Sequence, residues 1–191
     1  YTRFDVPGGT NELSLSREMY SVDKKINASS LGLPEPLEKI TDICTGNNGT
    51  VFILCSEPAR IVCLNADYTL KKILNITDKN GQAVNYVGAE GIYQDISGDI
   101  YVSDTKNSRV LVCNENGLVK QILEKPDSNL VPADFIYSPI AVERDAKGYT
   151  YILSDGCYYG ALLYSPSFEF MGFYGSNTVK TTALDTLSYL W

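Results

Sequence analysis

Histidine is absent from this chain of 191 residues, which also contains a single tryptophan and only two methionines. Without histidine, the chain lacks the commonest general base and the commonest protein ligand of zinc and copper. It also lacks a G-x-S-x-G motif, a Walker-type loop and any serine–histidine pairing. These absences remove the familiar sequence signatures of hydrolases, nucleotide-binding proteins and histidine-dependent metalloenzymes.

Long apolar segments and an excess of positive charge are missing too. No run of 18 or more apolar residues is present, so we expect no membrane-spanning helix. The net charge of −7 argues against a general attraction to nucleic-acid phosphates. Hydrophobic residues make up 44% and charged residues 20%, which is ordinary for a soluble globular domain. Because the chain begins with Tyr1 rather than methionine, we expect a mature or trimmed piece of a longer protein.

The cysteines show neither a disulfide framework nor a metal-binding pattern. No C-x-x-C pair occurs, and the odd number of cysteines rules out complete internal pairing. Two of them end apolar runs, ARIVC and RVLVC, which is typical of small buried residues in strands. We therefore expect inert packing thiols. The five are Cys44, Cys55, Cys63, Cys113 and Cys157.

What the chain does have is an internal repeat. Residues 40–73, ITDICTGNNGTVFILCSEPARIVCLNADYTLKKI, align without a gap on residues 89–122, AEGIYQDISGDIYVSDTKNSRVLVCNENGLVKQI, at an offset of 49 (89 − 40). A third copy, residues 138–174, follows at an offset of 50, as from Gly98 to Gly148 (148 − 98). Repeats of this length indicate solenoids, propellers or arrays.

Each repeat contains four short apolar runs separated by turns rich in glycine, asparagine and aspartate, which predicts a four-stranded antiparallel meander. One such sheet cannot bury both of its faces, and radial stacking of four-stranded sheets is the β-propeller. We predict an all-β fold, a partial propeller of about three blades. The predicted segments are an N-terminal extension with possible closing strands (1–36), blades at 37–74, 88–123 and 137–175 within 37–175, and a C-terminal tail (176–191).

The second repeat resembles a known family. Its GIYQDISGDIYVSDTKNSRVLVCNENGLV stretch closely resembles the NHL repeat, and the likeness covers about two-thirds of the chain. The block PADFIYSPIAVERDAKGYTYILSDGCYYGALLYSPSFEFMGFYG looks like the extracytoplasmic NHL region of Gram-positive bacterial membrane proteins that carry a Yip-type membrane domain. The resemblance implies half of a six-bladed propeller at an extracytoplasmic surface, in a parent protein anchored in the membrane.

The resemblance also implies a role for Arg109. In the resembling repeats, an aspartate and an arginine flank the turn between the second and third strands and tie that loop together. Asp104 and Arg109 occupy these positions here, with Asn107 closing the turn. Arg60 is the equivalent arginine of the first repeat, and Gly160 replaces it in the third. We predict a structural pair; the alternative is that Arg109 points at a ligand on the propeller face.

Tyrosines and long loops are the candidate binding features. The long connections between repeats, 74–87 and 124–137, lie at one rim, where loops usually bind. Exposed tyrosine is enriched where proteins bind proteins or sugars. We expect binding from Tyr93, Tyr137, Tyr158 and Tyr159, together with Glu90. We expect strand packing from Tyr101, Tyr149, Tyr151 and Tyr164.

Carboxylates are the candidate metal ligands. Lactonase-like propellers hold a divalent cation, such as calcium, in a ring of carboxylates and amides, and Glu90 is the residue to test here. We expect these acids to be solvated turn residues instead, with no metal or other cofactor. The acids considered are Asp42, Glu90, Asp95, Asp104, Glu143, Asp145 and Asp155.

Three blades leave the partial propeller open at both ends, and such open edges favour association with other chains. The remaining blades lie downstream in a longer protein, or two chains complete a six-bladed ring, or a terminal strand covers the edge. For the isolated chain we predict self-association through these edges. We predict a non-catalytic module that binds a protein or glycan and no nucleic acid; the alternatives are a cation-dependent hydrolase or lactonase and a purely structural spacer.

Overall fold

The computed structural model describes residues 22–175, and these fold into three four-stranded antiparallel sheets. Sheet 1 contains β1 (Ile40–Thr45), β2 (Val51–Ser56), β3 (Ala59–Leu64) and β4 (Leu70–Leu74). Sheet 2 contains β5 (Gly91–Gln94), β6 (Ile100–Asp104), β7 (Arg109–Cys113) and β8 (Val119–Leu123). Sheet 3 contains β9 (Pro139–Arg144), β10 (Thr150–Ser154), β11 (Ala161–Tyr164) and β12 (Phe170–Tyr174).

In every sheet the strands pair in chain order, so each repeat is a meander. The remaining regular structure of residues 22–175 is three short 3₁₀ turns at Ser29–Leu31, Asn47–Gly49 and Thr105–Asn107. The second and third of these lie between strands of a repeat, where glycine, asparagine or aspartate interrupts the apolar runs. No helix in residues 22–175 has the length and apolar character needed to span a bilayer.

The turn between the first two strands shows why the repeat keeps an aspartate and a glycine three residues apart. In sheet 3, the Asp145 carboxylate accepts the backbone N–H groups of Lys147 and Tyr149 at 2.9 Å each. Gly148 has φ of 88°, a left-handed conformation that glycine adopts without steric cost. Asp95 and Gly98 repeat this arrangement in sheet 2. Residues 145–148 therefore form the turn between β9 and β10.

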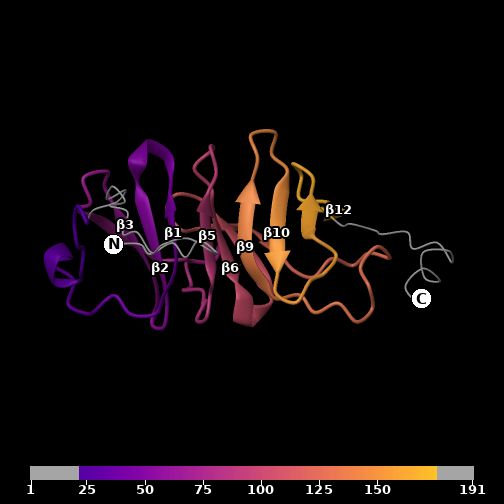
Figure 1. The fold of residues 1–191 in the computed structure, drawn as a ribbon, viewed down its shortest axis with the longest axis horizontal. Coiled ribbons are helices and arrows are strands. Elements are labelled where there is room, and N and C mark those ends of the chain that lie inside the picture. Colours follow the sequence, from indigo (N-terminus) through magenta and orange to yellow (C-terminus); the bar gives the residue numbers. More distant parts are fainter. Residues whose placement is uncertain (1–21, 176–191) are drawn as a thin grey trace, which may run out of the picture.

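The sheets stand face to face and bury two cores between them (Figure 1). The core between sheets 1 and 2 contains Phe52, Leu54, Ile61, Ile92, Val102 and Leu111. The core between sheets 2 and 3 contains Tyr101, Val110, Val112, Val142, Ile152 and Leu162. Sheet 2 is therefore covered on both faces, as its nearly continuous apolar runs require. The predicted all-β fold of stacked four-stranded sheets is confirmed.

The first strands of the sheets lie next to one another along the stack. The Asp42 carboxylate on β1 accepts the backbone N–H of Ile92 on β5 at 2.8 Å. The Tyr93 hydroxyl on β5 donates to the backbone carbonyl of Arg144 on β9 at 2.8 Å. Neighbouring sheets are thus joined by polar contacts at their first strands as well as by the apolar cores.

The two ends of the stack differ. Ile26, Leu31, Leu33 and Leu37 pack on the outward face of sheet 1. Residues 22–27 form no strand, so this part of the predicted N-terminal extension covers the sheet without a closing strand. Residues 1–21 and the predicted tail, 176–191, lie outside the described residues.

Candidate functional site

The turn between β6 and β7 is held by the residues that the sequence singled out. The Asp104 carboxylate is completely buried and accepts a hydrogen bond from Arg109 Nε at 2.7 Å and one from Asn107 Nδ2 at 2.8 Å. Arg109 also donates to the backbone carbonyl of Asn85 at 3.0 Å. The guanidinium is thus occupied by its own loop and by the preceding connection, which is the geometry of a structural pair.

Arg60, the equivalent residue in sheet 1, has different partners. Its guanidinium donates to the backbone carbonyl of Pro36 and lies 3.6 Å from the Glu35 carboxylate. No aspartate is available to it, because Cys55 occupies the position of Asp104 in this repeat (104 − 49) and pairs with Arg60 across β2 and β3. Arg60 therefore holds the segment that covers sheet 1, a role that the repeat alignment did not indicate.

Of the four tyrosines expected to bind, one lies in the core between sheets 2 and 3 and a second packs against that core. Tyr137 is 3% exposed, packs between sheets 2 and 3, and donates its hydroxyl proton to the Leu123 carbonyl at 3.4 Å. Tyr93 is half-buried beside Tyr101, with 6.1 Å between the ring centroids. For Tyr137 the expectation of ligand contact is corrected, because its loop faces the neighbouring sheet and buries the ring. Tyr93, whose hydroxyl donates to the Arg144 carbonyl, helps to join sheets 2 and 3, and its contact with a ligand stays a prediction.

Tyr158 and Tyr159, by contrast, lie at the surface on the loop between β10 and β11. Tyr158 is 94% exposed, while the Tyr159 ring packs on Phe173, with 5.5 Å between the centroids. A hollow with a volume of ≈ 440 Å³ lies beside them. Its other lining residues come from the connection between sheets 2 and 3 and from the start of the same loop: Asp134, Phe135, Ile136, Ser138, Asp155 and Gly156. We call it the tyrosine hollow.

The tyrosine hollow combines apolar rings with negative charge. Ile136 is 78% exposed at its border. The carboxylates of Asp134 and Asp155 line the hollow, and neither forms a hydrogen bond or ion pair with another residue of 22–175. Lysine and arginine are not among its lining residues. The rings supply contact area, and the carboxylates accept hydrogen bonds from hydroxyl or ammonium groups.

The candidate metal ligands are dispersed over strands and turns of the three sheets. Asp95 accepts hydrogen bonds from Ser97 and from the backbone N–H of Asp99, and its second oxygen accepts one from Tyr101 at 3.1 Å. Glu90 is exposed next to β5, and Glu143 is exposed on the outward face of sheet 3. Within residues 22–175, no three side chains of histidine, cysteine, aspartate or glutamate gather in a metal-binding group.

Burial makes the core cysteines poor nucleophiles. It raises the pKa of Cys63 to about 11 and that of Cys113 to about 12. Burial also raises the pKa of Cys44 to about 12, and the nearby Asp42 carboxylate acts in the same direction. These thiols stay protonated near neutral pH, in agreement with the expectation of inert packing residues.

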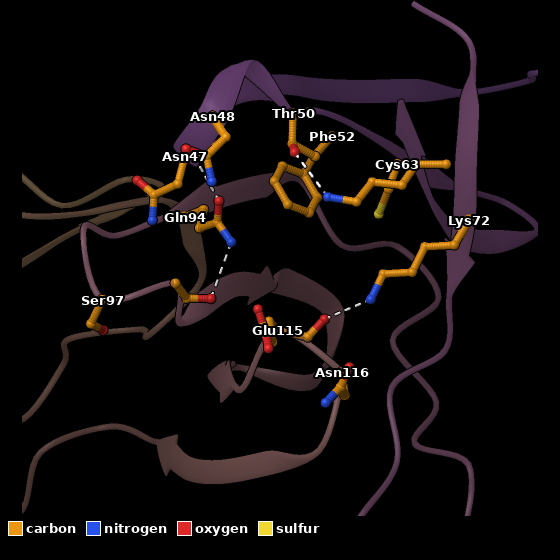
Figure 2. Close-up of a pocket in the computed structure, with 12 residues that line it drawn as sticks. Asn47, Asn48, Thr50, Phe52, Cys63, Lys72, Gln94, Ser97, Glu115 and Asn116 are labelled. Atoms are coloured by element: carbon orange, nitrogen blue, oxygen red, sulfur yellow. Dashed lines mark hydrogen bonds between the residues drawn. The ribbon is translucent and has the colours of Figure 1, made fainter. Parts of the chain in front are cut away.

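A second hollow lies between sheets 1 and 2, at the end of the strands that carries the β1–β2, β5–β6 and β7–β8 turns (Figure 2). The tyrosine hollow lies at the other end of the strands, beside the β10–β11 loop. Its volume is ≈ 360 Å³. The sequence pattern did not indicate it, because its lining comes from separate strands and turns that meet only when the two sheets stack. We call it the lysine pocket; its main lining residues are Asn47, Asn48, Thr50, Phe52, Lys71, Lys72, Gln94, Glu115 and Asn116.

Hydrogen bonds across the two sheets shape the lysine pocket. Lys72 on β4 donates to the backbone carbonyl of Glu115 in the β7–β8 turn at 2.8 Å, as Figure 2 shows. The Gln94 side-chain oxygen accepts the backbone N–H of Asn47 at 2.8 Å, and its amide donates to the Gly98 carbonyl at 3.1 Å. The polar walls are therefore fixed by the same contacts that join sheet 1 to sheet 2.

No protein-family model and no curated protein sequence matches this chain. Solved structures do resemble it. Virginiamycin B lyase from Staphylococcus aureus, an inactive variant with quinupristin, superposes with a TM-score of 0.52 at 14% identity, over 73% of this chain and 42% of that chain. Hydrazine synthase of Kuenenia stuttgartiensis gives a TM-score of 0.52 at 13% identity, over 73% and 37%.

A protein of unknown function from Bacteroides caccae gives a TM-score of 0.53 at 12% identity, over 75% of this chain and 48% of that chain. The fold is part of a β-propeller. At identities this low, the likeness establishes the fold alone. The matched part of this chain spans less than half the length of these three proteins, so the fold described here is a portion of what they contain.

Proposed function

We propose that this chain is part of an NHL-type, six-bladed propeller that acts as a non-catalytic binding module. It recognises a protein or a glycan at an extracytoplasmic surface through the loops that carry the tyrosine hollow. The support for the family is the sequence of the second repeat and its Asp104–Arg109 turn. The support for the location includes a structural neighbour described as a candidate exported protein of Bacteroides fragilis, with a TM-score of 0.51 at 13% identity.

The observation that carries the proposal is the exposure of Tyr158 and Ile136 around a hollow with two unengaged carboxylates. Exposed apolar area on Tyr158 and Ile136 contributes nothing to the stability of the fold. Contact with a ligand would remove that area from water, which favours binding. The Tyr159 ring is held in place by Phe173, so part of the surface is already ordered before binding. Ordering in advance lowers the entropic cost of association.

The alternative, a hydrolase or lactonase that uses a cation in the channel, receives less support. Asp95, Asp104 and Asp145 each accept hydrogen bonds within their own turns. Each carboxylate thereby stabilises its local turn, and binding a shared cation would require these bonds to break. The distribution of the acids favours a structural role for them over a catalytic one.

The proposal is tested by measuring binding of the fluorescently labelled chain to Gram-positive bacterial cells by flow cytometry. We expect Tyr158→Ala to reduce cell binding about tenfold, because it removes a large part of the contact area. Tyr68→Ala is the matched control: Tyr68 is also exposed but lies in the β3–β4 turn, away from the tyrosine hollow. Cells treated with protease or with periodate distinguish a protein from a glycan ligand.

Equal binding by the wild type and Tyr158→Ala, or an equal loss in Tyr68→Ala, would refute the role of the hollow. A thermal-shift series with Ca²⁺, Mg²⁺ and Zn²⁺ addresses the enzyme alternative. Stabilisation by several degrees with one cation, abolished by Glu90→Gln, would favour that alternative over a non-catalytic module.

A further inference from the structure

The lysine pocket lies at the end of the sheets opposite the tyrosine hollow, and it differs from that hollow in charge. Two lysines and one glutamate line it, whereas the tyrosine hollow has two aspartates and no basic residue. The chain as a whole carries a net charge of −7. The pocket thus has a positive net charge in a protein whose net charge is negative. A positive pocket suits a ligand that carries negative charge.

Both lysines are oriented by hydrogen bonds that leave donors available. The Lys71 ammonium donates to Thr50 Oγ1 at 3.2 Å, and the Lys72 ammonium donates to the Glu115 carbonyl at 2.8 Å. A lysine ammonium has three N–H donors, so each keeps two for a ligand after making this contact. Neither ammonium forms an ion pair with a carboxylate of residues 22–175. Their charge is thus not neutralised by a neighbouring side chain.

The remaining lining suits a polyhydroxylated ligand. Gln94 has one amide N–H left after donating to Gly98, and the side chains of Asn48 and Asn116 contribute further amide groups at the border. The Glu115 carboxylate accepts hydrogen bonds from hydroxyl groups. Phe52, buried in the core between the sheets, supplies an apolar floor. Amide donors, a carboxylate acceptor and an aromatic side chain in one pocket suit the hydroxyls and the apolar face of a sugar ring.

We propose that the lysine pocket binds an anionic monosaccharide unit, with a hexuronic acid as the simplest member of this class. Its carboxylate lies between the ammonium groups of Lys71 and Lys72, and its hydroxyls bond to Gln94, Glu115 and Asn116. The volume of ≈ 360 Å³ falls within the range of about 300–1,000 Å³ found for small-molecule sites. This site is separate from the tyrosine hollow and goes beyond the proposed function.

The test is isothermal titration of the 191-residue chain with glucuronate, glucose and acetate at low salt. We expect glucuronate to bind at least tenfold more tightly than either glucose or acetate, because only glucuronate combines the charge with the hydroxyls. Tight binding of acetate alone would overturn the sugar-ring part of the proposal. The absence of detectable binding of glucuronate at millimolar concentration would overturn all of it.

Matched charge variants locate the ligand. Lys71→Gln and Lys72→Gln each remove one positive charge from the pocket, and we expect glucuronate affinity to fall at least tenfold in each. Lys120→Gln removes the same charge from β8, where Lys120 pairs with Asp99 at 2.5 Å and does not line the pocket. Equal loss of affinity in Lys120→Gln would mean a general charge effect and would overturn the site. Circular dichroism melts verify that each variant folds.

The two proposals fail separately. We expect Tyr158→Ala to keep glucuronate binding and Lys71→Gln to keep cell binding, because the two sites lie at opposite ends of the sheets. Loss of glucuronate binding in Tyr158→Ala would contradict the assignment of that ligand to the lysine pocket. Cell binding by Lys71→Gln would still test the tyrosine hollow independently.

Discussion

The outward faces of sheets 1 and 3 form the two ends of the stack, and they differ in how far other residues cover them. On sheet 1, Val62 and Leu64 are completely buried beneath the segment that contains Leu31 and Leu33. On sheet 3, Leu153 is 50% exposed and Tyr174 is 61% exposed. Both faces are apolar, but only the first is covered by residues of the described part of the chain.

Sheet 2 shows what the face of sheet 3 would look like if it were covered. Tyr101 and Tyr151 are equivalent residues of the second and third repeats, 50 positions apart (151 − 101). Tyr101 is completely buried because sheet 3 packs on it, whereas Tyr151 is only half-buried. Equivalent residues with the same local structure thus differ in burial, since burial depends on whether another sheet is present.

The difference in stability between the two faces is the largest expected effect. We predict that Leu64→Ala lowers the free energy of unfolding by about 3–5 kcal/mol, because it leaves a cavity in a packed core. Leu153→Ala should cost less than about 1 kcal/mol, since half of that side chain already lies in water. Urea unfolding followed by circular dichroism measures both. Similar losses in the two variants would show that the face of sheet 3 is covered in solution.

Self-association is the next prediction, because a bare apolar sheet face favours contact with another chain. We expect light scattering at micromolar concentration to give a mass above that of one chain, 21.1 kDa. Leu153→Lys should restore the monomer, whereas Ile96→Lys, at an exposed site in the β5–β6 turn, should not. A strictly monomeric wild type would contradict this prediction.

The smallest effect concerns the thiols in the covered regions. Burial raises the pKa of Cys63 from 9.0 to about 11, so the folded state retains a proton that the unfolded state loses. The resulting stabilisation is fully present below about pH 9 and disappears as the pH rises through about 11. We therefore expect the urea midpoint to fall over this interval and to fall less in Cys63→Ala. A midpoint with the same pH dependence in both proteins would exclude Cys63 as a contributor.

Much of the fold could be predicted from the repeat. The spacing of apolar runs and turn residues defines the strands, because alternating side-chain directions and left-handed turn positions are local requirements. The contact between Asp104 and Arg109 could also be anticipated, since both residues flank one short turn. In each case the interacting residues are near neighbours in the sequence.

The binding features were less predictable. Tyr137 and Tyr158 both belong to loops at the same rim, but the first is buried between sheets and the second projects into solvent. The lysine pocket joins Asn47 to Asn116, almost 70 positions apart (116 − 47), through the meeting of two sheets. Nothing in the local pattern of either segment indicates the other.

The amino-acid sequence by itself determined the repeating four-stranded unit, its turns and the need for each sheet to be covered, because these follow from local backbone preferences and apolar patterning. Only the tertiary structure decided which tyrosines reach solvent, which segment covers sheet 1 and where the two hollows form. The physical reason is that burial and pocket shape are properties of surfaces brought together by stacking, and one strand does not specify what will lie against it.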